Sequence, residues 1–284
     1  MGYQERDFEI VDYQIYQLKN TEFFLRGPEP QNLDEKKYFV CAGAAQTFGC
    51  FCEKPYPTLL QEEMNMPALN LGFGGAGPYF FLKNEGLLKY INNSKFAVIQ
   101  IMSGRSESNS LFDSGGLEYL TRISDGIKIG AEDAYKQLLK QNNPNFVKQI
   151  IAETRHNWVH NFKEFLKKIQ IPKILLWFSM RRPFYIASYT SLSGLFRGFP
   201  QLVNSNMVAQ VRQYTDEYVE CISKRGMPQL LISRFTGKPT TIDPADARKD
   251  LGTGKRQMFN NYYFSPEMQI DAAHILRTAC KKYN

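Results

Sequence analysis

Short apolar runs alternate with amphipathic segments along most of the chain. The predicted strands are YFVCAG (38–43), PALNLG (67–72), FAVIQIM (96–102), KILLWFS (173–179) and PQLLISRF (228–235). These runs show little polar alternation, which is typical of strands covered on both faces in a parallel sheet. Helical spacing of apolar residues predicts helices at 55–65, 79–92, 146–169, 207–226 and 265–283.

The regular order of strands and helices predicts a doubly wound α/β fold, with a three-layer, flavodoxin-like parallel sheet of about five strands. Residues 1–36, which are polar and rich in tyrosine, predict an N-terminal extension that packs on a domain formed by residues 37–284. The stretch 103–145 does not follow this alternation of strands and helices, which predicts an insertion after the third strand. Ligands of such sheets bind beyond the carboxyl ends of the strands. The loops expected around that crevice are 43–50, 72–78, 103–110 and 179–201.

The composition indicates a globular protein and gives no sign of a membrane or secreted one. The chain has 284 residues, of which 43% are hydrophobic and 22% charged, as expected of a globular protein with a sizeable core. No apolar run approaches about 20 residues, so no membrane span is predicted. The charged N-terminus lacks the apolar region of a secretory signal, and five scattered cysteines form no CxxC pair. We therefore expect a cytoplasmic protein with free, buried thiols.

Four blocks of the sequence resemble the SGNH, or GDSL-type, hydrolase superfamily. The family's Gly-Asp-Ser-x-Thr-x-Gly block corresponds to GAAQTFG (43–49), and its Asn-x-Gly-x-x-Gly-Ala block to NLGFGGA (70–76). The Gly-x-Asn-Asp block corresponds to GRSE (104–107), and the histidine before a Ser-Pro helix start corresponds to Tyr263. This resemblance spans about residues 38–283 and implies an SGNH-like fold.

The departures from the family fall on its catalytic groups. Ala44 and Ala45 stand where the family has Asp and Ser, Ser106 replaces Asn, and Tyr263 replaces His. Hydrolysis of that type needs a hydroxyl group and an imidazole that takes its proton. We therefore expect no Ser-His esterase activity. The remaining candidates for acid–base catalysis are Glu107, Tyr263 and Glu267.

A crevice that keeps hydrogen-bond donors without a nucleophile is expected to bind an anion or a carbonyl. The resemblance implies an oxyanion hole that includes the backbone N–H of Gly75. Arginine suits phosphate because it binds two oxygens at once, and a net charge of +7 also favours an anionic partner. The segment RRPFYIAS (181–188) resembles the Arg-x-Pro…Ser element by which P-loop sulfotransferases hold a 3′-phosphate. The predicted ligand-binding residues are Gln46, Thr47, Asn70, Gly75, Ser103, Arg105, Ser106, Asn109, Arg181 and Arg182.

The first functional hypothesis is an acyl- or sulfotransferase. It would hold an anionic donor, either acyl-CoA or a nucleotide of the adenosine 3′,5′-bisphosphate type, and modify a glycan or a small molecule. One alternative is a non-catalytic module that binds a carbohydrate or a protein. Another is a hydrolase with its nucleophile relocated to Thr47, Ser103 or Ser106.

Two further classes of site are not expected. His156 and His160 lie one helical turn apart, but no HExxH pattern accompanies them, so no metal site is predicted. The sequence has no RRM, KH or helix-turn-helix signature, so no nucleic-acid partner is predicted.

Overall fold

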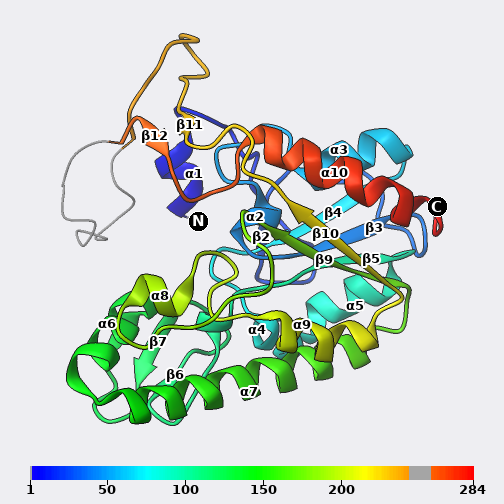
Figure 1. Cartoon of the computed structure of the whole chain (residues 1–284). Coiled ribbons are helices and arrows are strands. Elements are labelled where there is room, and N and C mark those ends of the chain that lie inside the picture. The colour runs from blue at the N-terminus through cyan, green and yellow to red at the C-terminus, as the bar shows by residue number, and fades with distance from the viewer. Residues whose placement is uncertain (1, 243–256) are drawn as a thin grey trace.

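A five-stranded parallel sheet forms the centre of the molecule (Figure 1). The computed structural model describes residues 2–242 and 257–284. The strands of this sheet are β3 (Phe39–Gly43), β4 (Ala68–Gly72), β5 (Ala97–Gln100), β9 (Lys173–Ser179) and β10 (Glu217–Ile222). Their spatial order is β10-β9-β5-β3-β4, and each pairing is parallel. Numbered along the chain and read from β4, this is the 2-1-3-4-5 order of flavodoxin-like sheets, which confirms the predicted fold.

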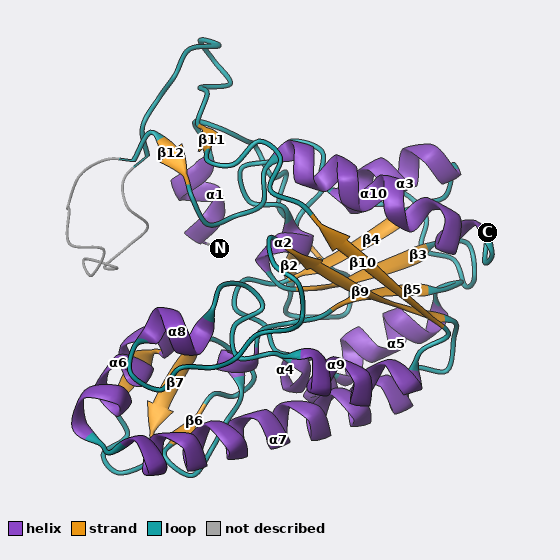
Figure 2. Cartoon of the chain, in the orientation of Figure 1, coloured by secondary structure: helices purple, strands orange, loops and turns teal. Residues whose placement is uncertain are grey.

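Helices cover both faces of the sheet (Figure 2). On one face, α3 (Tyr56–Met64) and α10 (Pro266–Lys281) pack against each other. The helices on the other face are α4 (Pro78–Lys83), α5 (Glu85–Asn93), α7 (Pro144–Lys168) and α9 (Ser205–Val211). The start of α10 follows the sequence signals, because the Ser265 hydroxyl accepts a hydrogen bond from the backbone N–H of Met268.

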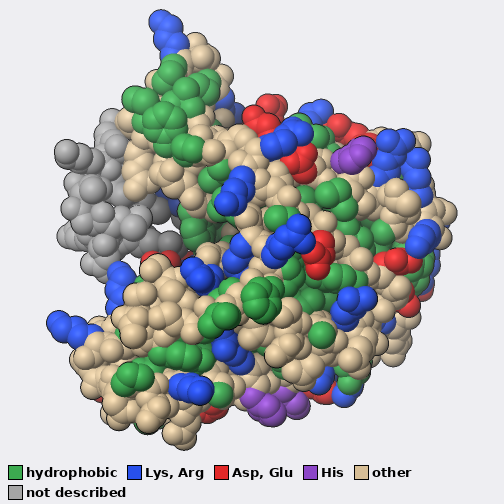
Figure 3. All heavy atoms as spheres, in the orientation of Figure 1, with side chains coloured by type: hydrophobic (Ala, Val, Ile, Leu, Met, Phe, Trp, Pro, Cys, Tyr) green, Lys and Arg blue, Asp and Glu red, His purple; other side chains and the backbone are tan. Residues whose placement is uncertain are grey.

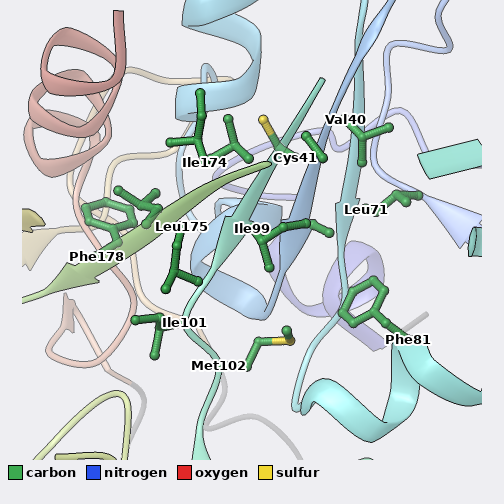
Figure 4. Packing of buried hydrophobic residues seen from close by; sticks show 14 of the residues in the cluster. Val40, Cys41, Leu71, Phe81, Ile99, Ile101, Met102, Ile174, Leu175 and Phe178 are labelled. Carbon is green, nitrogen blue, oxygen red and sulfur yellow. The ribbon is translucent and has the colours of Figure 1, made fainter. Parts of the chain in front are cut away.

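The hydrophobic core lies between the sheet and these helices. Val40, Leu71, Ile99 and Leu175 on four neighbouring strands are fully buried, and Phe81 of α4 packs beside them (Figure 4). Burying such a side chain stabilises the fold by about 1.5–3 kcal/mol. The apolar runs therefore form strands because both of their faces are covered.

The fifth strand does not lie where the apolar pattern predicts it. Residues 207–226, predicted as one helix, contain the end of α9, the 3-10 turn η2 (Arg212–Tyr214) and β10. The segment EYVECI, which contains the strand-favouring Tyr218, Val219 and Ile222, pairs with β9 at the sheet edge, so tertiary pairing overrides the helical spacing. The predicted strand 228–235 instead contains β11 (Gln229–Leu230), which pairs with β12 (Phe259–Asn260) outside the main sheet.

The segment after β5 folds into a small unit of its own. Its elements are the 3-10 turn η1 (Gly104–Ser106), β6 (Phe112–Asp113), β7 (Tyr119–Arg122), β8 (Lys128–Gly130) and α6 (Ala131–Gln141). The three strands pair antiparallel in the order β6-β7-β8. A separate hydrophobic cluster holds this unit together, and α8 (Leu192–Phe196) and the first turns of α7 contribute to that cluster.

The N-terminal extension contains α1 (Gly2–Asp7) and a hairpin of β1 (Tyr16–Gln17) and β2 (Phe24–Leu25). The buried Arg26 fastens it to the domain. Its guanidinium donates to the carbonyl oxygens of Phe48, Gly49, Cys52 and Glu53 at 2.5–3.1 Å. The extension therefore holds the loop that follows β3.

All five cysteines are buried and free, as the sequence predicts. Across the described residues, no helix is both long and apolar enough to cross a membrane.

Candidate functional site

The loops that follow β3, β4 and β5 meet at the carboxyl edge of the sheet and enclose a cavity. The residues that line it from these loops are Ala44, Ala45, Gln46, Gly75, Ala76, Ser103, Arg105 and Ser106. The strand order reverses between β3 and β5, which is where doubly wound sheets bind their ligands. Positions from all four of the blocks quoted above thus line one cavity, Tyr263 among them.

Side chains from distant parts of the chain close the cavity. They are Tyr3 of α1, Glu118 of the insertion, and Phe199, Tyr262 and Tyr263. The remaining volume is about 20 Å³, which is room for one water molecule. A larger ligand therefore needs one of these side chains to move.

The turn after β3 is held by a buried amide. Gln100 of β5 accepts hydrogen bonds at Oε1 from the backbone N–H of Ala44 (3.0 Å) and from the Thr47 hydroxyl (2.6 Å). Thr47 also contacts the Tyr56 hydroxyl at 3.0 Å. The one-turn helix α2 (Ala45–Phe48) then ends at Gly49, whose φ of +81° favours glycine. Thr47 therefore shapes the turn and does not line the cavity.

The second block supports the same turn from β4. Asn70 donates from Nδ2 to the Thr47 carbonyl oxygen (3.0 Å) and accepts at Oδ1 from the backbone N–H of Gly72 (2.9 Å). A Cβ atom on Gly72 would lie 2.1 Å from the Phe48 backbone nitrogen, so no other residue fits. Asn70 is therefore a scaffold residue of the site.

Arg105 lies in the cavity wall with its charge already balanced. Its Nη1 donates to Glu132 at 2.9 Å, and its Nη2 donates to Glu118 and to the Tyr262 hydroxyl. Burial alone would lower the pKa of Arg105, but Tyr262, Glu118 and Glu132 raise the pKa above its usual value. The arginine is a permanent cation, and both carboxylates pair with it.

Several polar atoms around the cavity are buried without a partner among the described residues. They are Nε2 and Oε1 of Gln46, Oγ of Ser106 and Nε of Arg105. The three residues are at most 4% exposed. Buried polar atoms almost always find a hydrogen-bond partner, so this group indicates a place where a ligand or water is held.

Of the other predicted ligand-binding residues, some line the cavity and some lie away from it. Gly75 and Ser103 line the cavity, and the Ser103 hydroxyl accepts from the backbone N–H of Arg105 at 3.2 Å. Asn109 instead bonds Thr154 and the following turn. Arg181 donates to the carbonyl oxygens of residues 182, 198, 200 and 203, and Arg182 is exposed. The structure does not bring Asn109, Arg181 or Arg182 to the cavity.

Of the three acid–base candidates, only Tyr263 lines the cavity. Glu107 is buried behind it, where Asn161 donates to Oε2 at 2.7 Å. Burial raises the pKa of Glu107 to about 7, while Asn161 and the backbone N–H of Tyr79 oppose this rise. Glu267 is exposed in the first turn of α10.

Sequence reasoning missed Tyr3, Glu118 and Tyr262, whereas Phe199 lies in the loop 179–201 that was expected around the crevice. The insertion follows β5 directly, and this position was a signal that one of its side chains would reach the strand ends. The sequence offered no signal for Tyr3, because a short polar helix does not show where it docks. No cluster of three metal-ligating side chains occurs within residues 2–242 and 257–284.

The chain belongs to the family described as "Domain of unknown function (DUF6473)", whose model matches residues 1–114 and 136–243. No curated protein matches the sequence significantly.

Several solved structures share a distant similarity with this chain. A lipase from a goat rumen metagenome superposes with a TM-score of 0.38 at 12% identity, over 71% of this chain and 89% of the lipase. A family 2 carbohydrate esterase from Corynascus thermopiles (Myceliophthora fergusii) gives 0.38 at 11% identity, over 89% and 68% of the two chains. A G-D-S-L family protein from Desulfitobacterium hafniense gives 0.34 at 11% identity, over 85% and 100%. These similarities are distant, and the fold is assigned from the strand order of this chain.

Proposed function

We propose that this member of the DUF6473 family is a non-hydrolytic binding protein on an SGNH-like fold, and that its ligand is a neutral molecule rich in hydroxyl groups, such as a sugar. The observation that carries the proposal is the set of unpartnered buried atoms on Gln46, Arg105 and Ser106. This set contains donors, an acceptor and a hydroxyl group. A ligand hydroxyl both donates and accepts, so it satisfies either kind of atom.

The charges at the cavity favour a neutral ligand. Arg105 was predicted to attract an anion, but Glu118 and Glu132 already neutralise it. An added anion would compete with these two carboxylates for the same guanidinium group. Aromatic rings of Phe199, Tyr262 and Tyr263 supply flat apolar surface around the polar atoms, as is common in pockets that orient a small molecule.

Hydrolysis is disfavoured by the same geometry. Ala45 offers no nucleophile, and none of the residues that line the cavity is a histidine. Of the relocated candidates, Thr47 is bound to Gln100, and Ser103 accepts from a backbone N–H. Ser106 has no partner in the described chain that takes its proton. A serine without a base is a weak nucleophile.

One observation favours the transferase as a second candidate. Arg155, Arg181 and Arg197 lie close together, and none of them forms an ion pair within the described part of the chain. Burial lowers the pKa of Arg181 to about 10; Tyr185 opposes this shift, and the two neighbouring arginines strengthen it. An anionic donor such as CoA or adenosine 3′,5′-bisphosphate would supply the missing negative charge.

Isothermal titration calorimetry separates the two candidates. We expect neutral hexoses or N-acetylhexosamines to bind, and Gln46→Ala to weaken that binding about tenfold, because one ligand hydrogen bond is worth about 1.4 kcal/mol or less. Gln213→Ala, which changes an exposed amide on α9's C-terminal side, is the matched control. Binding of only CoA or adenosine 3′,5′-bisphosphate, with loss in Arg197→Glu, would instead support the transferase.

A further inference from the structure

We propose that Tyr3 occupies the ligand's place in the cavity, so that α1 is an internal competitor for a ring-shaped ligand that carries a hydroxyl group. This inference rests on the proposed function and adds the shape of the ligand and the control of its entry. The volume of the cavity is only about 20 Å³, although unpartnered polar atoms of Gln46, Arg105 and Ser106 line it.

The phenol of Tyr3 is seated against the loop after β4. A Cβ atom on Gly74 would lie 2.3 Å from the Tyr3 hydroxyl oxygen, and the other close atoms are also Tyr3 atoms. Gly74 has no positive φ, so its backbone conformation suits other residues, and the three atoms nearest to an added Cβ all belong to Tyr3. The Tyr3 ring lies 5.3 Å from the ring of Phe48 and 6.0 Å from the ring of Tyr263. A six-membered ring with one hydroxyl group therefore fits this place.

The rest of α1 holds Tyr3 there by a few contacts. The Arg6 guanidinium lies over the rings of Tyr3, Phe51 and Tyr263 at 4.9–5.4 Å. Arg6 pairs with Asp7, and Asp7 accepts a hydrogen bond of 2.6 Å from the Tyr13 hydroxyl. The helix itself has only six residues, which is too few for a stable helix without these contacts to the rest of the molecule. Release of Tyr3 therefore needs the movement of one short helix and leaves the sheet intact.

Competition by Tyr3 lowers the apparent affinity of the cavity in proportion to the fraction of molecules in which it is open. Tyr3→Ala should leave a hollow of the shape of a phenol ring. We expect p-cresol, the side-chain analogue of tyrosine, to bind this variant and not the wild type in calorimetry. We also expect any hexose that binds the wild type to bind Tyr3→Ala at least tenfold more tightly.

Two further variants distinguish the displacement of Tyr3 from a general loss of the fold. Gly74→Ala displaces Tyr3 from the opposite side and should raise amide exchange in residues 3–7 without altering β3 or β5. Tyr3→Phe keeps the ring and should still exclude p-cresol. If hexoses bind wild type and Tyr3→Ala equally and p-cresol binds neither, the competitor role of Tyr3 is wrong while the proposed function stands. If p-cresol binds Tyr3→Ala but no sugar binds either protein, Tyr3 is a competitor and the proposed sugar ligand is wrong.

Discussion

At the scale of single residues, Glu107 was a candidate for acid–base catalysis, but its hydrogen bonds give it a structural role. It is 1% exposed, and its donors are the Asn161 amide and, at 3.5 Å, the backbone N–H of Tyr79. Because neither donor carries a charge, they do not offset the burial of a carboxylate. Glu107 thus ties α4 and α7 to the loop after β5.

Glu107 makes the stability of the protein depend on pH. Its pKa is about 7 in the folded state and near 4.5 when exposed, so the unfolded state loses its proton first. The free energy of unfolding should therefore fall as pH rises from about 4.5 to 7. We expect Glu107→Gln, which stays neutral, to exceed the wild type by about 1–3 kcal/mol at pH 8 and to match it near pH 4.5.

Urea unfolding at both pH values measures this difference. Glu22→Gln, which changes an exposed carboxylate, is the control and should leave the pH dependence unchanged. Equal stability of Glu107→Gln and wild type at pH 8 would show that the buried carboxylate costs nothing.

The sequence predicted which loops meet at the cavity better than it predicted what each side chain does there. Ala45, Gly75, Arg105, Ser106 and Tyr263 do gather at one cavity, because parallel strands end at the same sheet edge. The balance of charge was not predictable, since Glu118 and Glu132 reach Arg105 from the insertion. Gln100 was hidden in a run interpreted as apolar.

At the scale of elements, Arg26 joins the N-terminal extension to the loop after β3. Burial lowers its pKa, and the nearby groups that oppose this shift include Tyr13 and Cys52. Its hydrogen-bond acceptors are carbonyl oxygens at the end of α2 and in the turn that follows it. Arginine suits this place because its planar donors reach several carbonyl oxygens at once.

We expect Arg26→Met to lower the free energy of unfolding by about 3 kcal/mol, because several buried carbonyl oxygens lose their donor. Arg26→Lys should lose less, since it keeps some donors. Urea denaturation of both variants measures the loss, with Arg277→Lys on the exposed side of α10 as control. An unchanged midpoint in Arg26→Met would mean that the loop does not depend on this arginine.

Elements with one dominant signal were predictable from sequence, and elements with competing signals were not. The helix at 146–169 has a long apolar face and forms α7. Residues 217–222 combine helical spacing with strand-favouring side chains, and pairing with β9 decides in favour of the strand. Such pairing depends on a strand about forty residues away, which local patterns do not report.

At the scale of the whole molecule, α7 spans two hydrophobic cores. Val147, Ile150 and Ile151 belong to the core of the insertion, whereas Trp158 and Phe162 belong to the core under the sheet. Basic side chains are spread over the visible face and interspersed with neutral and acidic ones (Figure 3). The two cores, joined by one helix, suggest two regions of different local stability.

We expect Leu138→Ala, in the insertion, to open that unit locally at a cost of about 2–4 kcal/mol. Amide exchange should then rise in β6–β8 and α6 and stay unchanged in β3 and β5. Phe162→Ala should lower the global unfolding midpoint instead. If Leu138→Ala lowers that midpoint as much as Phe162→Ala, the molecule has a single cooperative core.

The position of α1 beside the cavity decides where an affinity tag can be placed without disturbing ligand binding. An affinity tag fused ahead of Gly2 would extend from the helix that carries Tyr3, and it would bias any ligand screen by pulling on that helix. The last residues of the chain lie beyond the opposite edge of the sheet, past α10 (Figure 1). Purification handles for this protein belong at residue 284.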